Sequence, residues 1–138
     1  MPRVALLLAV LALVLAAAGC GGGDASSDDG VSHEANLVVT VWPNGYGGDE
    51  VSWTLECDPV GGDHPDKDAA CATLASLKDP FGKVKPTPRC NEIPGATDDR
   101  ATVTGTYQGK KVDQMFDRKN GCHFERWDRL GPVFPTGF

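Results

Sequence analysis

The sequence has none of the short motifs that mark common enzyme sites. It has no glycine-rich phosphate loop, no Gly-x-Ser-x-Gly nucleophile elbow and no Cys-x-x-Cys pair. Only three histidines occur in the 138 residues, and the spacing of His33, His64 and His123 does not fit a zinc site. Carboxylate pairs such as Asp98-Asp99 fall in polar turns, where solvated or capping roles are commoner than catalysis. We therefore predict that the protein is not an enzyme and that it binds no metal or cofactor.

Positive charge is also scarce. The chain has 13 Lys and Arg against 19 Asp and Glu, a formal net charge of −6, and no basic stripe with interleaved aromatic residues. Nucleic acid is therefore excluded as a partner, because its binders need such a surface. A length of 138 residues suits one small domain rather than two.

Long apolar runs are limited to one, at residues 4–18, which follows a positive start at Arg3 and is too short for a comfortable membrane span. The run ends in Ala-Ala-Ala-Gly-Cys, which resembles the bacterial lipoprotein signal, where the cysteine is acylated and becomes the new N-terminus. We therefore expect a signal peptide at residues 1–19 and a lipid on Cys20, with ordinary secretion as the alternative. The expected location is extracellular, at the surface of the bacterial membrane.

The twelve residues after Cys20, GGGDASSDDGVS, have almost nothing to bury, so residues 20–35 are predicted to form a flexible tether. A flexible segment of this length spans roughly 20 Å. It would hold an ordered domain at residues 36–138 just off a membrane or wall surface.

Without Cys20 the cysteines form an even set: Cys57, Cys71, Cys90 and Cys122. A small exported domain gains considerably from disulfides, so we expect two bridges, and the sequence alone allows three pairings. The alternative is that Cys20 is cleaved off with the signal or left as a free thiol.

Alternating apolar and polar residues predict antiparallel strands, most clearly in VSWTLEC, where Val51, Trp53, Leu55 and Cys57 share one face. The Asn44-Gly45 turn before it indicates a hairpin. The strands expected from these patterns are 37–42, 51–57, 100–107 and 111–116, with the tail 132–138 as a last edge strand.

Helical spacing predicts two short helices. One is expected at 69–77 with Asp68 as its N-cap, and the other at 122–130 with Gly131 as its stop. Four or five antiparallel strands with two helices make an α+β sandwich.

Several segments together resemble the Streptomyces subtilisin inhibitor family. They are LECDPVGGDHPDKDAACATLASL at 55–77, YQGKKV at 107–112, NGCHFE at 120–125 and PVFPTGF at 132–138. The resemblance covers about 37–138. It implies a five-stranded antiparallel sheet with two helices, the disulfides Cys57–Cys71 and Cys90–Cys122, and a homodimer formed through the sheets.

The resemblance also implies a site. In this family, the loop just after the third cysteine is offered to a serine protease like a substrate, and the reactive bond lies two residues past that cysteine. Carried over, this bond is Glu92-Ile93, and the residues of the protease-binding loop are Arg89, Cys90, Asn91, Glu92, Ile93, Pro94 and Gly95. Glu92 would enter the specificity pocket of an extracellular serine protease. A loop already rigid in an extended shape loses little entropy on binding.

The chain departs from the family pattern at this loop. Family members usually carry a large residue such as Met or Lys at the position of Glu92 and then a Tyr-Asp-Pro run, whereas this chain has Pro94-Gly95-Ala96 and a loop two residues longer. A longer loop with a glycine is more mobile, and a carboxylate is a poor guest for an apolar pocket. The alternative is therefore a non-inhibitory, surface-anchored binding lipoprotein on the same scaffold.

Overall fold

The computed structural model describes residues 31–93, 95 and 97–136. The expected signal peptide, the expected lipid on Cys20 and most of the expected tether lie outside the described residues. No helix within the described ranges is long and apolar enough to cross a membrane.

The described strands form one antiparallel sheet of four strands in the order β2-β1-β3-β4. They are β1 (Ala35–Trp42), β2 (Val51–Cys57), β3 (Arg100–Tyr107) and β4 (Lys110–Asp117). All four were predicted from the sequence, β2 and β3 from their alternation, in which every second side chain turns toward the same face of the sheet. In β1 the buried residues are Ala35, Leu37, Val39 and Val41.

The prediction of five strands is wrong for the described part of the chain, because the tail folds differently. After α2 (Gly121–Leu130), residues Gly131–Val133 form the short 3-10 helix η2. Pro132 and Pro135 have no backbone N–H and cannot donate to a strand ladder. The buried Phe134 ring instead packs on the rings of Phe116 and Trp127, with centroids 5.0 and 4.5 Å apart. The tail therefore closes the core instead of widening the sheet.

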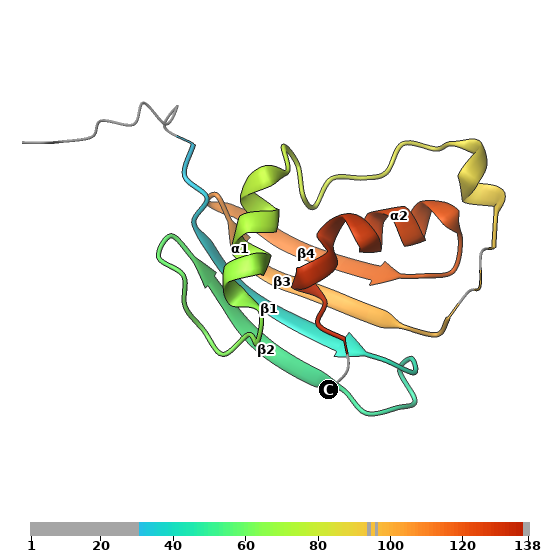
Figure 1. Cartoon of the computed structure of the whole chain (residues 1–138), viewed down its shortest axis with the longest axis horizontal. Coiled ribbons are helices and arrows are strands. Elements are labelled where there is room, and N and C mark those ends of the chain that lie inside the picture. Colours follow the sequence, from blue (N-terminus) through green and yellow to red (C-terminus); the bar gives the residue numbers. More distant parts are fainter. Residues whose placement is uncertain (1–30, 94, 96, 137–138) are drawn as a thin grey trace, which may run out of the picture.

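Two helices, α1 (Lys67–Ser76) and α2, cover one face of the sheet (Figure 1). The prediction of Asp68 as the cap of α1 is wrong: Asp68 lies in the first turn, and Asp66 at the cap position makes no side-chain cap hydrogen bond. An acidic residue in the first turn still complements the helix dipole. The start of α2 is better defined, because the N–H of His123 donates to the Asn120 side chain at 3.0 Å.

The strand register puts the beginning of β1 and the beginning of β3 at opposite ends of the domain. Ala35 pairs with Cys57 and Tyr107, whereas Trp42 pairs with Arg100. The chain therefore joins the sheet at one end, and the long connection between α1 and β3 reaches the other (Figure 1). Just before β1, the carbonyl of Glu34 accepts a hydrogen bond from the N–H of Gln108 at 2.8 Å. The N-terminal segment therefore contacts the β3–β4 hairpin from Glu34 onward, slightly before the predicted domain boundary at residue 36.

Candidate functional site

The candidate loop follows the connection from α1 and begins with a short 3-10 helix, η1 (Pro88–Asn91). Pro88 takes the first helical position, where the missing N–H of proline is no loss. The turn is closed by the N–H of Cys90, which donates to the Thr87 carbonyl at 3.0 Å. Glu92 has extended backbone angles, φ −83° and ψ 144°. The extended shape expected of this loop is therefore present at Glu92 but not in the residues before it.

Two side chains at the loop tip are strongly exposed. Ile93 is 73% exposed, and the Glu92 side chain is 59% exposed. The nearest opposite charge is Arg89, whose Nε lies 4.0 Å from Glu92 Oε2. Both side chains of this pair are in solvent, where an ion pair contributes little. The Glu92 side chain can therefore leave Arg89 for another environment at small cost.

A disulfide holds the front of the loop. Cys90 is bonded to Cys122, which is buried in the first turn of α2. The second disulfide, Cys57–Cys71, joins the end of β2 to α1. Both expected pairings are confirmed, and the one beside the candidate bond fixes η1 to the helix.

Gly121, the first residue of α2, packs directly against the loop. Its N–H donates to the Glu92 carbonyl at 2.9 Å. A Cβ atom on Gly121 would lie 2.2 Å from the Arg89 carbonyl oxygen, a distance at which the two backbones must separate. Glycine at this position therefore allows η1 to pack directly on α2.

The far side of the loop is held by charge. The carboxylate of Asp99 lies 3.6 Å from Arg118 and accepts a hydrogen bond from the Thr97 hydroxyl at 2.7 Å. The Arg118 guanidinium also lies 4.4 Å from the centroid of the Phe124 ring. Arg118 directly follows β4, and Cys122 lies in the first turn of α2, only four residues further along the chain. The two sides of the loop are thus attached to one stretch of chain, residues 118–122.

Asp117, the last residue of β4, stabilises the start of residues 118–122. Burial would raise the pKa of Asp117, but hydrogen bonds from His123 and the Lys119 N–H, together with the charges of His123 and Arg100, hold that pKa below its ordinary value. A depressed pKa in the folded state stabilises the fold above the pKa of the unfolded chain, and this contribution is lost as the pH falls through the folded value. The support for residues 118–122 is therefore kept at neutral pH and into mildly acidic solution.

The structure brings most of the expected site residues into one exposed segment: Arg89, Cys90, Asn91, Glu92, Ile93 and Gly95. Pro94 lies outside the described residues. Sequence patterns missed Gly121, Arg118 and Asp99, because all three act through contacts between segments distant in the sequence. In the described part of the chain, no three His, Cys, Asp or Glu side chains are grouped so that they could hold a metal ion.

Comparison with known proteins points to the same family as the resemblance in the sequence. The model of the subtilisin inhibitor-like family matches residues 34–120. A curated relative, subtilisin inhibitor-like protein 1 of Streptomyces cacaoi, is 34% identical over 79 residues, which cover 53% of this chain and 69% of the relative. The chain belongs to the subtilisin inhibitor-like family. Members of this family are inhibitors, so the prediction that the protein is not an enzyme is confirmed.

In this subtilisin inhibitor-like chain, replacing Gly121 with alanine is expected to destabilise the fold by roughly 1–3 kcal/mol, the usual range for overpacking. The added Cβ would push Arg89 away and lengthen the hydrogen bond to Glu92. Denaturant unfolding measures the loss, with Gly47→Ala as the matched control because nothing lies within 4 Å of a Cβ at Gly47. Equal stabilities of the two variants would show that the loop does not pack on α2 in solution.

Proposed function

We propose that this subtilisin inhibitor-like protein inhibits an extracellular serine endopeptidase of the subtilisin or trypsin type, with Glu92-Ile93 as the reactive bond. The observation that carries the proposal is the double attachment of the loop to residues 118–122. The Cys90–Cys122 disulfide lies before the bond, and the ion pair of Asp99 with Arg118 lies after it. The exposure of Glu92 and Ile93 and the similarity to subtilisin inhibitor-like protein 1 of Streptomyces cacaoi support it further.

Double attachment favours inhibition over simple proteolysis. A protease serine that attacks the Glu92 carbonyl carbon forms an acyl-enzyme and releases the amino group of Ile93. Since both cut ends stay tied to one segment, this amino group remains beside the acyl-enzyme at a high effective concentration. It can therefore attack the ester and reform the peptide bond faster than water hydrolyses it.

The hydrogen bond from Gly121 has to open during this reaction. The carbonyl oxygen of Glu92 must enter the oxyanion hole of the protease, and in the free protein it accepts from the Gly121 N–H. A protein hydrogen bond of this kind has a net value of about 1 kcal/mol, which corresponds to roughly a fivefold effect on affinity. The contact therefore weakens binding modestly and does not prevent it.

The proposal is tested by titrating the chain from Val31 onward against two proteases, one subtilisin-like and one that prefers glutamate. Residual activity is followed with a chromogenic substrate, and the inhibitor is followed by mass spectrometry. We expect stoichiometric inhibition of at least one enzyme, with slow, single cleavage between Glu92 and Ile93. Full activity of both enzymes, with the loop intact or rapidly cut to pieces, would exclude inhibition through this bond.

The second candidate function is a non-inhibitory, surface-anchored binding protein. Two observations favour it: the 3-10 turn of η1, which is not a substrate-like conformation, and the Pro-Gly-Ala sequence at 94–96 in place of the usual loop residues. It predicts that the loop behaves as an ordinary substrate and that a ligand binds elsewhere on the domain. The same titration therefore separates the two candidates.

Anchoring and dimer formation are further parts of the proposal. The lipoprotein-like sequence at the N-terminus supports a lipid on Cys20, which the mass of the N-terminal peptide from the membrane fraction would test.

A homodimer through the sheet is supported by two apolar side chains on the sheet face opposite the helices, Val38 and Met115, which are 42% and 56% exposed. A monomer at every concentration in sedimentation equilibrium would contradict the dimer.

A further inference from the structure

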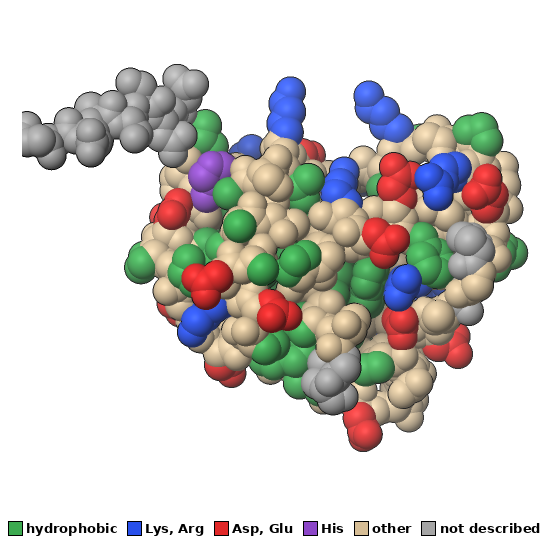
Figure 2. Space-filling model, in the orientation of Figure 1, with side chains coloured by type: hydrophobic (Ala, Val, Ile, Leu, Met, Phe, Trp, Pro, Cys, Tyr) green, Lys and Arg blue, Asp and Glu red, His purple; other side chains and the backbone are tan. Residues whose placement is uncertain are grey.

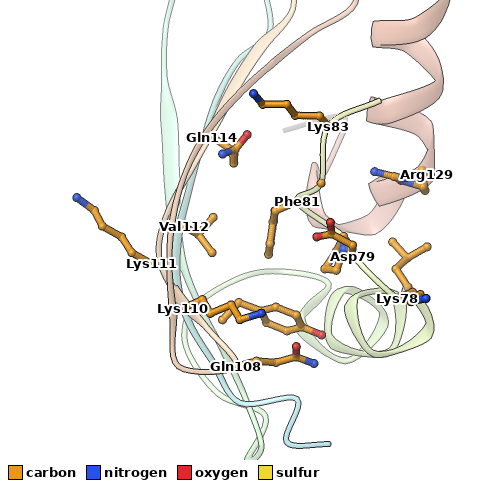
Figure 3. A pocket seen from close by; sticks show the side chains of 14 residues that line it. Lys78, Asp79, Phe81, Lys83, Gln108, Lys110, Lys111, Val112, Gln114 and Arg129 are labelled. Carbon is orange, nitrogen blue, oxygen red and sulfur yellow. The ribbon is translucent and has the colours of Figure 1, made fainter. Parts of the chain in front are cut away.

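A basic groove lies between the connection after α1, the β3–β4 hairpin and the end of α2 (Figure 3). Its volume is about 760 Å³, within the range of small-molecule sites. The segment that forms one wall is Leu77–Lys83, and residues 107–114 of the hairpin form the other. Nothing in the proposed inhibitory mechanism uses this groove, which lies away from Glu92-Ile93.

Cations from three separate segments converge on the groove. Lys83, Lys110 and Arg129 reach over it from three sides, whereas Lys111 points away from it (Figure 3). None of the three makes an ion pair or a side-chain hydrogen bond within the described residues. One carboxylate, Asp79, lines the same groove. The groove is thus positively charged in a chain whose formal net charge is −6.

The floor of the groove is apolar. The Phe81 ring meets the Tyr107 ring edge to face, with centroids 5.6 Å apart, and Leu77 and Val112 complete the floor. The Tyr107 hydroxyl donates to the Leu74 carbonyl at 3.0 Å, which fixes the ring beside α1. Cations above an apolar floor match a ligand that carries an anionic group on an apolar body.

The groove is at the end of the domain where the N-terminal part of the chain arrives. Tyr107 and Gln108, which line the groove, also contact the residues just before β1: His33 Nδ1 lies 3.4 Å from the Tyr107 hydroxyl, and the Gln108 N–H donates to Glu34. Ten residues lie between Cys20 and Val31, so the eleven steps from one to the other span at most roughly 40 Å of fully extended chain. A membrane that holds Cys20 is therefore within reach of the groove.

We propose that the groove binds the phosphate headgroups of an anionic phospholipid membrane, and this inference rests on the proposed anchoring at Cys20. The phosphate would accept hydrogen bonds from Lys83, Lys110 and Arg129, while the glycerol and upper acyl region would cover Phe81. The net negative charge repels the rest of the domain from an anionic surface, so the groove selects one orientation. Lys and Arg side chains project along the upper edge in Figure 2, where the connection after α1 runs in Figure 1.

This orientation has a consequence for the candidate loop. The eight residues of β1, with a rise of roughly 3.4 Å each, separate the membrane end of the domain from the end that carries the loop. A lipid headgroup held in the groove would therefore lie at the other end of the strand from Glu92-Ile93 and would not cover this bond.

The test uses the chain from Val31 onward, which contains the whole described core and both disulfides but no lipid. Flotation is measured with vesicles of phosphatidylcholine alone and of phosphatidylcholine with an equal part of phosphatidylglycerol. We expect binding to the phosphatidylglycerol vesicles alone, weakened by added salt. Because each basic residue near an anionic surface contributes about fivefold, Lys83→Glu with Lys110→Glu should reduce the partition coefficient at least roughly twentyfold.

The matched control is Lys67→Glu with Lys119→Glu, which changes the net charge equally and leaves the groove intact; it should keep most of the binding. Equal losses in the two double variants, or no binding of the unmodified domain, would overturn the inference. Binding of inorganic phosphate or of an acidic peptide in the groove, without vesicle binding, would also overturn it. The protease titration is independent of these results, because the groove variants leave the loop unchanged and the tested domain carries no lipid.

Discussion

Replacing Glu92 with leucine is expected to raise the affinity of the domain for a subtilisin-like protease at least about tenfold, since burial of a leucine side chain contributes roughly 1.5–3 kcal/mol. The change also removes the cost of taking a carboxylate out of water. That cost is several kcal/mol for an unpaired charge, and Arg89 at 4.0 Å in solvent does not offset it. The inhibition constant, measured by titration with a chromogenic substrate, gives the result directly.

Two further variants and a second enzyme identify the cause. Glu92→Gln removes the charge without adding apolar surface, so it should give part of the increase in affinity expected for Glu92→Leu. Asp98→Leu makes a similar change at an exposed position outside the expected bond and should leave the affinity unchanged. Against a glutamate-preferring protease, Glu92→Leu should lower the affinity. If Glu92→Leu changes the affinity for neither enzyme, Glu92 does not occupy the specificity pocket and the reactive bond lies elsewhere.

The sequence predicted the sheet well because alternation is a local property. In β2, Val51, Trp53, Leu55 and Cys57 do lie on one face, since successive side chains in a strand point to opposite sides. The prediction was wrong at the tail, where an apolar run was read as an edge strand. There, two prolines and the packing of Phe134 on Trp127 outweighed the strand-like composition.

The candidate loop was predictable in position but not in conformation. Its cysteine and its exposed Ile93 could be read from the sequence. The 3-10 turn arises from local hydrogen bonds around Pro88, which compete with an extended backbone. The contact of Gly121 with Glu92 joins residues far apart in the chain, and a single glycine beside a cysteine gives no sign of it. The double attachment to residues 118–122 therefore required the structure.

Removing the Cys90–Cys122 disulfide with a pair of alanine substitutions is expected to turn the inhibitor into a substrate. In the chain-entropy model, a bridge that closes a loop of this size, with a sequence separation of 32, stabilises the fold by roughly 3–4 kcal/mol. The loss of stability is the smaller part of the effect. Without the bridge, the segment before the cut keeps no covalent link to α2, so the new amino group of Ile93 and the acyl-enzyme separate and water completes the hydrolysis.

The other disulfide separates these two effects. Alanine at both Cys57 and Cys71 opens a bridge with a sequence separation of 14 and should cost about 3 kcal/mol, but it leaves the loop attached to α2. Mass spectrometry during incubation with protease should therefore show rapid cleavage at Glu92-Ile93 for the Cys90–Cys122 variant and slow cleavage for the Cys57–Cys71 variant. Similar cleavage rates in the two variants would mean that global opening exposes the bond. In that case, attachment of the loop to residues 118–122 would not account for resistance to cleavage.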